Sequence, residues 1–127
     1  MTRNALKIIS EAMKHLGLEY GFARYQKYPV VYPYWVGEYQ ELAPTSENGH
    51  STSTLLLTGN HRGSWEELET QKASIENYFN KVSGRTVMAD DGSAVAVFYN
   101  NSLVIPTMDA ELKKIQINLD IHEWGVK

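Results

Sequence analysis

The clearest pattern in the sequence lies in residues 111–124, where apolar and polar side chains alternate. The apolar positions are Ile115, Ile117, Leu119 and Ile121, and the polar positions are Gln116, Asn118, Asp120 and His122. A period of two is typical of an antiparallel strand with one face toward a core and the other toward water. The rest of the chain must therefore supply a layer that covers the apolar face of this strand.

Two segments have the spacing of helices that would form this layer. In residues 4–16 the apolar positions recur along one helical face, and Gly17 follows as a stop signal. Ser64 and Glu67 form the S-x-x-E pattern of a helix start. This second helix is expected to continue at helical spacing through Leu68, Lys72, Ile75, Phe79 and Val82.

The remaining periodic segments are short and rich in residues that favour strands. They cover residues 18–25, 34–42, 51–58, 85–89 and 94–99, in addition to the final strand. Because the strands come in runs, a mostly antiparallel β-sheet packed with two α-helices is favoured over a doubly wound fold. We expect one α+β domain over residues 1–127, with the element order α-β-β-β-α-β-β-β.

Cysteine is absent, which excludes disulfides, thiolate zinc sites and a cysteine nucleophile and is typical of a reducing compartment. The formal net charge of -3 provides no overall basic field, so sequence-specific binding to nucleic acid is not expected. The N-terminal segment lacks the continuous apolar core of a signal peptide, and no stretch reaches the length of a membrane-spanning helix. We expect a cytoplasmic protein that does not enter a membrane.

The sequence contains no motif for catalysis, a cofactor or a metal ion. Its four histidines lie on different expected elements without the i, i+4 spacing of a helical metal site, and we interpret them as surface or capping residues. His61 and Arg62 precede a helix start where an anion could bind, but the capping residues already use those amides. Asp109 and Glu111 could form a carboxylate pair in a loop, but no basic or nucleophilic partner has a sequence signature nearby. We therefore expect neither an enzyme nor a bound cofactor.

Aromatic residues are concentrated in residues 25–39, which contain five tyrosines and one tryptophan. Four of these residues are candidates for contact with a partner protein: Tyr32, Tyr34, Trp35 and Tyr39. Tyr and Trp are enriched in the cores of interfaces. Stacking on nucleic acid bases is disfavoured, because only Arg24 and Lys27 supply positive charge. The open alternative is that the aromatic side chains fill the core of the domain itself.

Residues 43–50 cluster turn-forming types without periodicity and are expected to form a surface loop between two strands. The segment has no apolar anchor after Ala43, so we expect it to be mobile in an isolated subunit. Such loops commonly become ordered on docking. The candidate interface residues from this loop and from the following helix start are Pro44, Glu47, Asn48, His61 and Arg62.

Three stretches stand out together: YPVVYPYWVGEYQE, LLLTGNHRGSWEELE and AELKKIQINLDIHEW. With the order of elements, they resemble the tail-terminator proteins of long-tailed bacteriophages and prophages, which complete the tail and join it to the head. The resemblance covers nearly the whole chain and brings no catalytic residues with it. It implies a small α/β subunit that forms a ring, commonly of six copies, at the head-proximal end of the tail.

In that family, the ring stops the growth of the tail tube and then presents a surface to the neck of the head. The implied partners are further copies of the chain, the tail-tube protein, and neck or head-completion proteins. The implied location is the bacterial cytoplasm during assembly, and afterwards the tail or neck of the virion. The outer strands are expected to associate between copies, because free sheet edges must be paired or covered.

Two functions of other classes also fit the residues. A small enzyme or ligand-binding domain would place its site among His61, Arg62 and the tyrosine-rich strand, and a perturbed histidine titration would reveal it. A monomeric adaptor would instead dock one partner on the tyrosine-rich face or on an edge strand. The mass of the protein in solution separates an adaptor from a ring.

Overall fold

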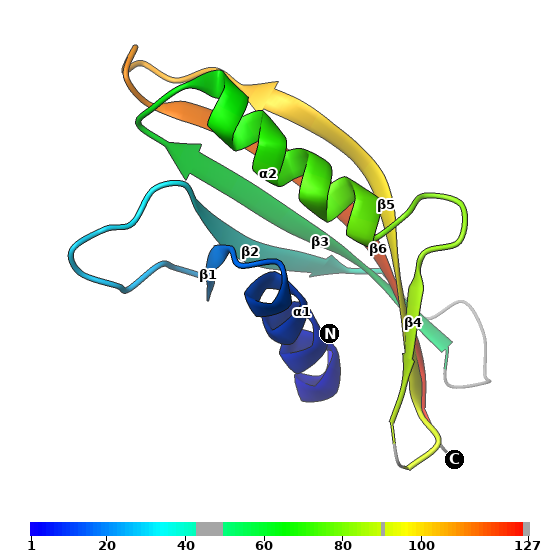
Figure 1. Ribbon diagram of the computed structural model, residues 1–127. Helices are drawn as coiled ribbons and strands as arrows, with labels where there is room; N and C mark the ends of the chain where they lie inside the picture. Colours follow the sequence, from blue (N-terminus) through cyan, green and yellow to red (C-terminus); the bar gives the residue numbers. More distant parts are fainter. Residues whose placement is uncertain (43–49, 90, 126–127) are drawn as a thin grey trace.

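The computed structural model describes residues 1–42, 50–89 and 91–125 (Figure 1). These residues contain two helices and six strands. They are α1 (Arg3–His15), β1 (Glu19–Phe22), β2 (Tyr34–Glu41), β3 (His50–His61), α2 (Trp65–Tyr78), β4 (Arg85–Met88), β5 (Ala94–Ile105) and β6 (Lys113–Trp124). The expected α+β class and the order α-β-β-β-α-β-β-β are confirmed.

The six strands of the described residues form one sheet in the order β1-β2-β3-β6-β5-β4. β1 runs parallel to β2, and each of the other neighbouring pairs is antiparallel. Its centre is the long pair of β3 and β6, in which Leu57 lies opposite Ile117. The two edges are the four-residue strands β1 and β4, which lie at opposite sides of the domain (Figure 1).

Both helices cover the same face of the sheet (Figure 1). α1 buries Ile9 and Met13 against this face, and α2 buries Leu68 and Ile75. The four apolar residues of β6 that were expected to face the core are buried: Ile115, Ile117, Leu119 and Ile121. Burial of this apolar surface is the main favourable contribution to folding. The assignment of the two faces of β6 is confirmed.

The opposite face of the sheet carries no helix within the described residues. Its centre consists of half-buried side chains from β3 and β6, including Thr54, Thr58, Gln116 and Asn118. Antiparallel sheets commonly have one packed face and one solvated face. The domain therefore has two layers, helices on sheet, and leaves one sheet face open.

A hydrogen bond connects the residue before α1 to the last strand. The hydroxyl oxygen of Thr2 accepts a hydrogen bond from the amide of Ala5 at 3.1 Å, and it donates one to Oε1 of Glu123 at 2.5 Å. Glu123 is buried, and a carboxylate is favoured near a helix N-terminus by the helix dipole. At the other end of α1, Gly17 has a positive φ of 74°, as expected for a helix stop.

The start of α2 agrees with the expectation, but its end does not. Oγ of Ser64 accepts a hydrogen bond from the amide of Glu67 at 3.3 Å, which confirms the N-cap. The helix ends at Tyr78, and Val82 lies outside it with 89% of its surface exposed. Asn80 causes the stop, because its Oδ1 accepts a hydrogen bond from the amide of Val82 at 2.7 Å and forms a turn. The expected continuation of the helix to Val82 was wrong.

β5 is longer than expected, since it continues past residue 99 to Ile105. The pairing of β5 with β6 shifts between Tyr99 and Asn101, which marks a bulge at Asn100. The side-chain amide of Asn100 donates hydrogen bonds to both carboxylate oxygens of Asp120, at 3.2 and 3.1 Å. Asn100 and Asn101 therefore mark a bulge inside the strand and not the end of the strand.

In the part of the chain that is described, neither helix is long and apolar enough to cross a membrane.

Candidate interaction surfaces

Trp35, one of the aromatic candidates for partner contact, lies in the core. Its side chain is fully buried, and its indole Nε1 donates a hydrogen bond to Oε1 of Gln71 at 2.8 Å. The ring packs on Gly59, where a Cβ atom would lie 2.7 Å from ring carbons. The interface assignment of Trp35 is corrected, because a side chain enclosed between sheet and helix cannot contact a partner.

The tyrosines on either side of Trp35 in the sequence have different surroundings. Tyr34 stacks on Tyr25 with ring centres 4.5 Å apart, and Tyr32 tilts against Tyr34 at 5.6 Å. Tyr39 lies farther along β2 and stacks on Phe22 of β1 at 5.8 Å. Tyr32 and Tyr39 keep part of their surface exposed. The aromatic candidates are thus divided between the core, the sheet edge and one protruding segment.

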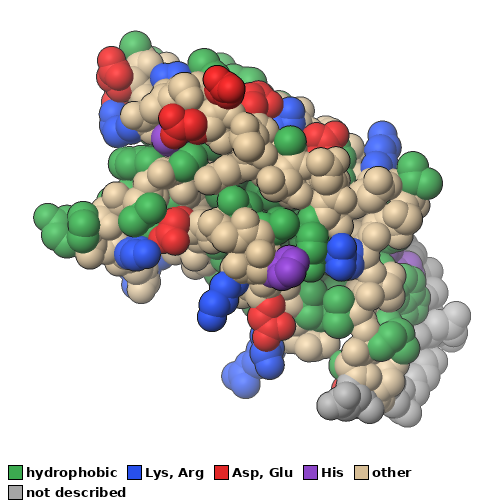
Figure 2. Space-filling model, viewed as in Figure 1, with side chains coloured by type: hydrophobic (Ala, Val, Ile, Leu, Met, Phe, Trp, Pro, Cys, Tyr) green, Lys and Arg blue, Asp and Glu red, His purple; other side chains and the backbone are tan. Residues whose placement is uncertain are grey.

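That protruding segment, residues 23–33, is here named the arm; it joins β1 to β2 and extends away from the sheet (Figure 1). Hydrophobic side chains gather on the protruding segment (Figure 2). Tyr28 is 93% exposed, and Val30, Val31 and Tyr32 are also exposed. Single exposed apolar residues are ordinary, but a contiguous group of them marks an interaction site.

The base of the arm is held by polar contacts with β1. Oε1 of Glu19 accepts hydrogen bonds from the hydroxyl of Tyr25 at 2.8 Å and from Nζ of Lys27 at 3.1 Å. These two donors hold the pKa of Glu19 below its usual value, with Tyr25 the larger cause. The amide of Ala23 donates to the carbonyl of Gly37 at 2.8 Å. The arm is therefore held at its base by hydrogen bonds and exposes apolar side chains at its tip.

His61 and Arg62 lie at the junction of β3 and α2. His61 is buried, which corrects the expectation of a surface residue. Its ring packs against Gly63, and its ring centre lies 6.4 Å from that of Tyr32. Its Nε2 lies 3.0 Å from Oε2 of Glu67, although neither ring nitrogen makes a hydrogen bond of good geometry within residues 1–42, 50–89 and 91–125. This carboxylate occupies the place that an anion would need.

Arg62 is engaged with a carboxylate that is distant in the sequence. Its Nη1 donates a hydrogen bond to Oδ2 of Asp109 at 2.8 Å. The pKa of Asp109 is lowered by the hydrogen bond from the amide of Glu111 and, next in size, by the Arg62 guanidinium. The basic partner of Asp109 therefore comes from a distant part of the sequence. The pair connects the start of α2 to the turn between β5 and β6.

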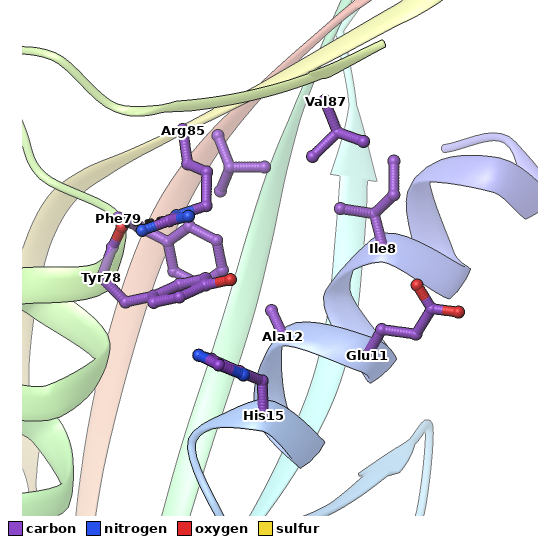
Figure 3. Close-up of a pocket in the computed structure, with 9 residues that line it drawn as sticks. Ile8, Glu11, Ala12, His15, Tyr78, Phe79, Arg85 and Val87 are labelled. Atoms are coloured by element: carbon purple, nitrogen blue, oxygen red, sulfur yellow. Dashed lines mark hydrogen bonds between the residues drawn. The ribbon is translucent and has the colours of Figure 1, made fainter. Parts of the chain in front are cut away.

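A groove lies between α1, the end of α2 and the edge strand β4 (Figure 3). Its volume is about 240 Å³, and its lining is mostly apolar: Ile8, Ala12, Phe79, Val87 and Val97, with Glu11, His15, Tyr78 and Arg85. The guanidinium of Arg85 lies 3.7 Å above the ring centre of Tyr78. The ring of His15 is 5.6 Å from that of Tyr78. Small-molecule sites usually measure roughly 300–1,000 Å³, so the groove suits a protein side chain better than a metabolite.

His50 and His122 form a pair that the sequence analysis missed. Nε2 of His50 lies 3.1 Å from Nδ1 of His122, and the ring of His50 stacks on Trp124 at 4.9 Å. The pair could have been found only from the register of β3 on β6, which brings together residues far apart in the sequence.

No group of three or more metal-binding side chains occurs among residues 1–42, 50–89 and 91–125.

The other candidates from the sequence, Pro44, Glu47 and Asn48, lie outside the described residues, as does the expected loop that contains them. Of the candidates within them, Tyr32, Tyr34, His61 and Arg62 come together at the base of the arm and the start of α2. Tyr39 lies apart from this group, at the β1 edge.

No protein-family model and no curated protein matches the sequence. The fold is similar to that of a chain in the virion of a native gene transfer agent particle. The likeness has a TM-score of 0.68 and covers 90% of this chain and 84% of that chain, at 8% sequence identity. At so low an identity, the likeness shows a shared fold.

Proposed function

We propose that this chain is a structural subunit of a phage-like particle. In this role it forms a ring at the head-proximal end of the tail, ends the growth of the tail tube and joins the tail to the head or neck. The observation that carries the proposal is the shared fold with a chain of a gene transfer agent virion, over nearly the full length of both chains. The resemblance of the sequence to tail-terminator proteins supports the same role.

The surfaces of the domain support assembly with other proteins. Its sheet has two short edge strands, β1 and β4, at opposite sides, and backbone groups on such edges tend to pair with or be covered by another chain. The apolar tip of the arm is exposed, and interfaces are enriched in such tyrosine-rich surfaces. The proposed partners are further copies of the chain, commonly six in all, the tail-tube protein and neck proteins.

An architectural role instead of catalysis is part of the proposal. The polar side chains at the junction of β3 and α2 lie against one another, with Arg62 paired with Asp109 and His61 beside Glu67. Catalytic groups are instead aimed at a site where a substrate can sit. The proposed location is the bacterial cytoplasm during assembly and the tail or neck of the finished particle.

The test is deletion of the gene from the genome that encodes it, followed by electron microscopy of the particles that form. We expect full heads without tails, together with tails of uncontrolled length. Restoration of the gene on a plasmid should restore tails of uniform length joined to heads. Normal tailed particles in the deletion strain would contradict the proposal.

A further inference from the structure

The histidine pair of His50 and His122 lies at the end of the sheet where β3 begins and β6 ends (Figure 1). His50 precedes Thr54 by four positions, and His122 follows Asn118 by four, so both rings project from the face that carries no helix within the described residues. Both rings are half-buried, which leaves part of each imidazole in contact with water. A dissolved ligand can therefore reach the pair.

Aromatic neighbours orient the two imidazoles. The ring of His50 stacks on that of Trp124, with ring centres 4.9 Å apart and an angle of 5° between the planes. The ring of His122 meets that of Phe98 edge to face, at 5.8 Å and 84°. Neither contact is a hydrogen bond to a ring nitrogen. The pair is therefore ordered before a ligand arrives, and binding costs little side-chain entropy.

The two facing nitrogens are spaced for two bonds to one metal ion. Nε2 of His50 lies 3.1 Å from Nδ1 of His122. Two zinc–nitrogen bonds of about 2.0–2.1 Å span roughly 3.3–3.4 Å at a tetrahedral angle. At the right angle of a square-planar Cu²⁺ or Ni²⁺ centre, bonds of this length span roughly 2.8–3.0 Å. The spacing falls between these values, so binding requires a small shift of the nitrogens and a rotation of the rings that aims both lone pairs at the ion.

The protonation of the pair also suits a metal ion. A hydrogen bond between two imidazole nitrogens requires one of them to accept, so at least one ring is neutral. A metal ion needs both facing nitrogens without a proton. When both rings are neutral, the donor ring only has to move its proton to its other nitrogen, and no proton leaves the pair. The ion then takes the place of the shared proton.

The ligand set decides which ions fit. Imidazole nitrogens suit Zn²⁺, Cu²⁺ and Ni²⁺, whereas Mg²⁺ and Ca²⁺ require oxygen ligands. In the part of the chain that the structure describes, no third metal-binding side chain joins the two histidines. Water fills the remaining positions on the ion, as at the open position of a catalytic zinc site. Such a site holds an exchangeable ion and not one that the fold requires.

We infer that His50 and His122 together bind one divalent transition-metal ion that prefers nitrogen ligands, through Nε2 of His50 and Nδ1 of His122. The inference goes beyond the proposed function and does not depend on it. Because the two ligands are 72 positions apart in the sequence, the site exists only in the folded chain. A bound ion therefore stabilises the folded state by mass action.

The first test follows the imidazole resonances of the untagged wild-type chain by nuclear magnetic resonance while Zn²⁺ is added at neutral pH. We expect the signals of His50 and His122 to change together in one saturable step, while those of His15 and His61 stay in place. The same concentration of Mg²⁺ should change none of them. Unchanged signals of His50 and His122, or changes of equal size at His15, would overturn the inference.

Variants of the two ligands measure their contribution to affinity. Loss of an outer-shell partner alone weakens metal binding roughly 10–100-fold, so loss of a ligand should weaken it by more than about tenfold. Titration calorimetry with Zn²⁺ should show this loss for His50→Gln and for His122→Gln. His15→Gln, which removes an exposed histidine of α1, is the matched control and should bind like the wild type. Equal affinities in all three variants would contradict the assigned ligands, and the wild-type resonances decide the matter if a ligand variant does not fold.

Fluorescence tests the position of the ion. Cu²⁺ quenches a nearby indole, and Trp124 is the tryptophan whose ring stacks on His50. Cu²⁺ should therefore quench a large part of the wild-type emission and a several-fold smaller part of the emission of Trp124→Phe, which keeps both ligands. Equal fractional quenching in the two proteins would place the ion away from the histidine pair and overturn the inference.

Discussion

The indole nitrogen of Trp35 and the side-chain oxygen of Gln71 lie 2.8 Å apart, which joins the second strand of the sheet to the middle of α2. The bond satisfies the polar atom of a tryptophan that is otherwise enclosed by apolar side chains. A buried donor without a partner costs more than the bond itself contributes, so the glutamine is needed once the tryptophan is there. The pair links β2 directly to α2.

Gln71→Ala is predicted to lower the free energy of unfolding by about 1–3 kcal/mol, because Nε1 of Trp35 loses its acceptor in the core. Chemical denaturation followed by tryptophan fluorescence measures the change. Thr70→Ala, at the neighbouring exposed position of the same helix, is the control and should have a much smaller effect. Equal losses in the two variants would show that the hydrogen bond contributes nothing specific.

The core between α2 and β6 gives a second prediction. Ile75→Ala and Ile117→Ala should each cost on the order of 2–5 kcal/mol, because both side chains are fully buried and truncation leaves a cavity. Val82→Ala is a matched control from beyond the end of α2, where the side chain is exposed, and should change the melting temperature little. An unchanged melting curve for Ile117→Ala would contradict the assignment of this face of β6 to the core.

Local patterns were sufficient to predict much of the fold. The alternation in residues 115–121 identified the core face of β6, and the cap at Ser64 identified the start of α2. Both signals depend on residues within a few positions of each other. The end of α2 was missed because the Asn80 side chain bonds to the backbone two residues later, and this bond outweighed the apolar position of Val82.

The candidate surfaces were less predictable, because they depend on which distant residues the sheet brings together. Arg62 and Asp109 are 47 positions apart in the sequence, and His50 and His122 are 72 apart. Hydrophobicity also does not distinguish Trp35, which is in the core, from Tyr28, which is on the tip of the arm. Only the pairing of β2 with β3, which places Trp35 beside Gly59, separates these two roles.

The hydrogen bonds that Asp109 accepts, from the amide of Glu111 and next in size from Arg62, predict a small dependence of stability on pH in the acid range. The pKa of Asp109 is lowered in the folded protein, so the stabilisation is present above the ordinary value of 3.8 and is lost as the pH falls through the lowered value. Asp109→Asn should therefore be less stable than the wild type near neutral pH, and the difference should shrink below pH 3.8. Denaturation midpoints at both pH values measure it, with Glu38→Gln, which alters an exposed carboxylate on β2, as the control. A difference that stays constant with pH would exclude the ionised carboxylate of Asp109 as its source.

The buried hydroxyl of Tyr20 predicts that the protein loses stability at alkaline pH. Its hydroxyl is buried beside Gly37 without a hydrogen-bond partner among the described residues, and burial raises its pKa from 10.0 to about 12. The folded protein therefore keeps the proton that the unfolded chain releases above pH 10. Its contribution to stability is complete below pH 10 and is lost as the pH rises toward 12, by on the order of 1–3 kcal/mol.

Tyr20→Phe removes both the ionisable group and the unpartnered hydroxyl. At neutral pH we expect this variant to be as stable as the wild type or more stable, because no hydrogen bond is lost. Between pH 10 and pH 12 the variant should lose less stability than the wild type, which denaturation midpoints across that range will show. Tyr28→Phe, which changes an exposed tyrosine on the arm, should follow the wild type throughout. Parallel curves for Tyr20→Phe and the wild type would mean that the Tyr20 hydroxyl reaches water in the folded protein.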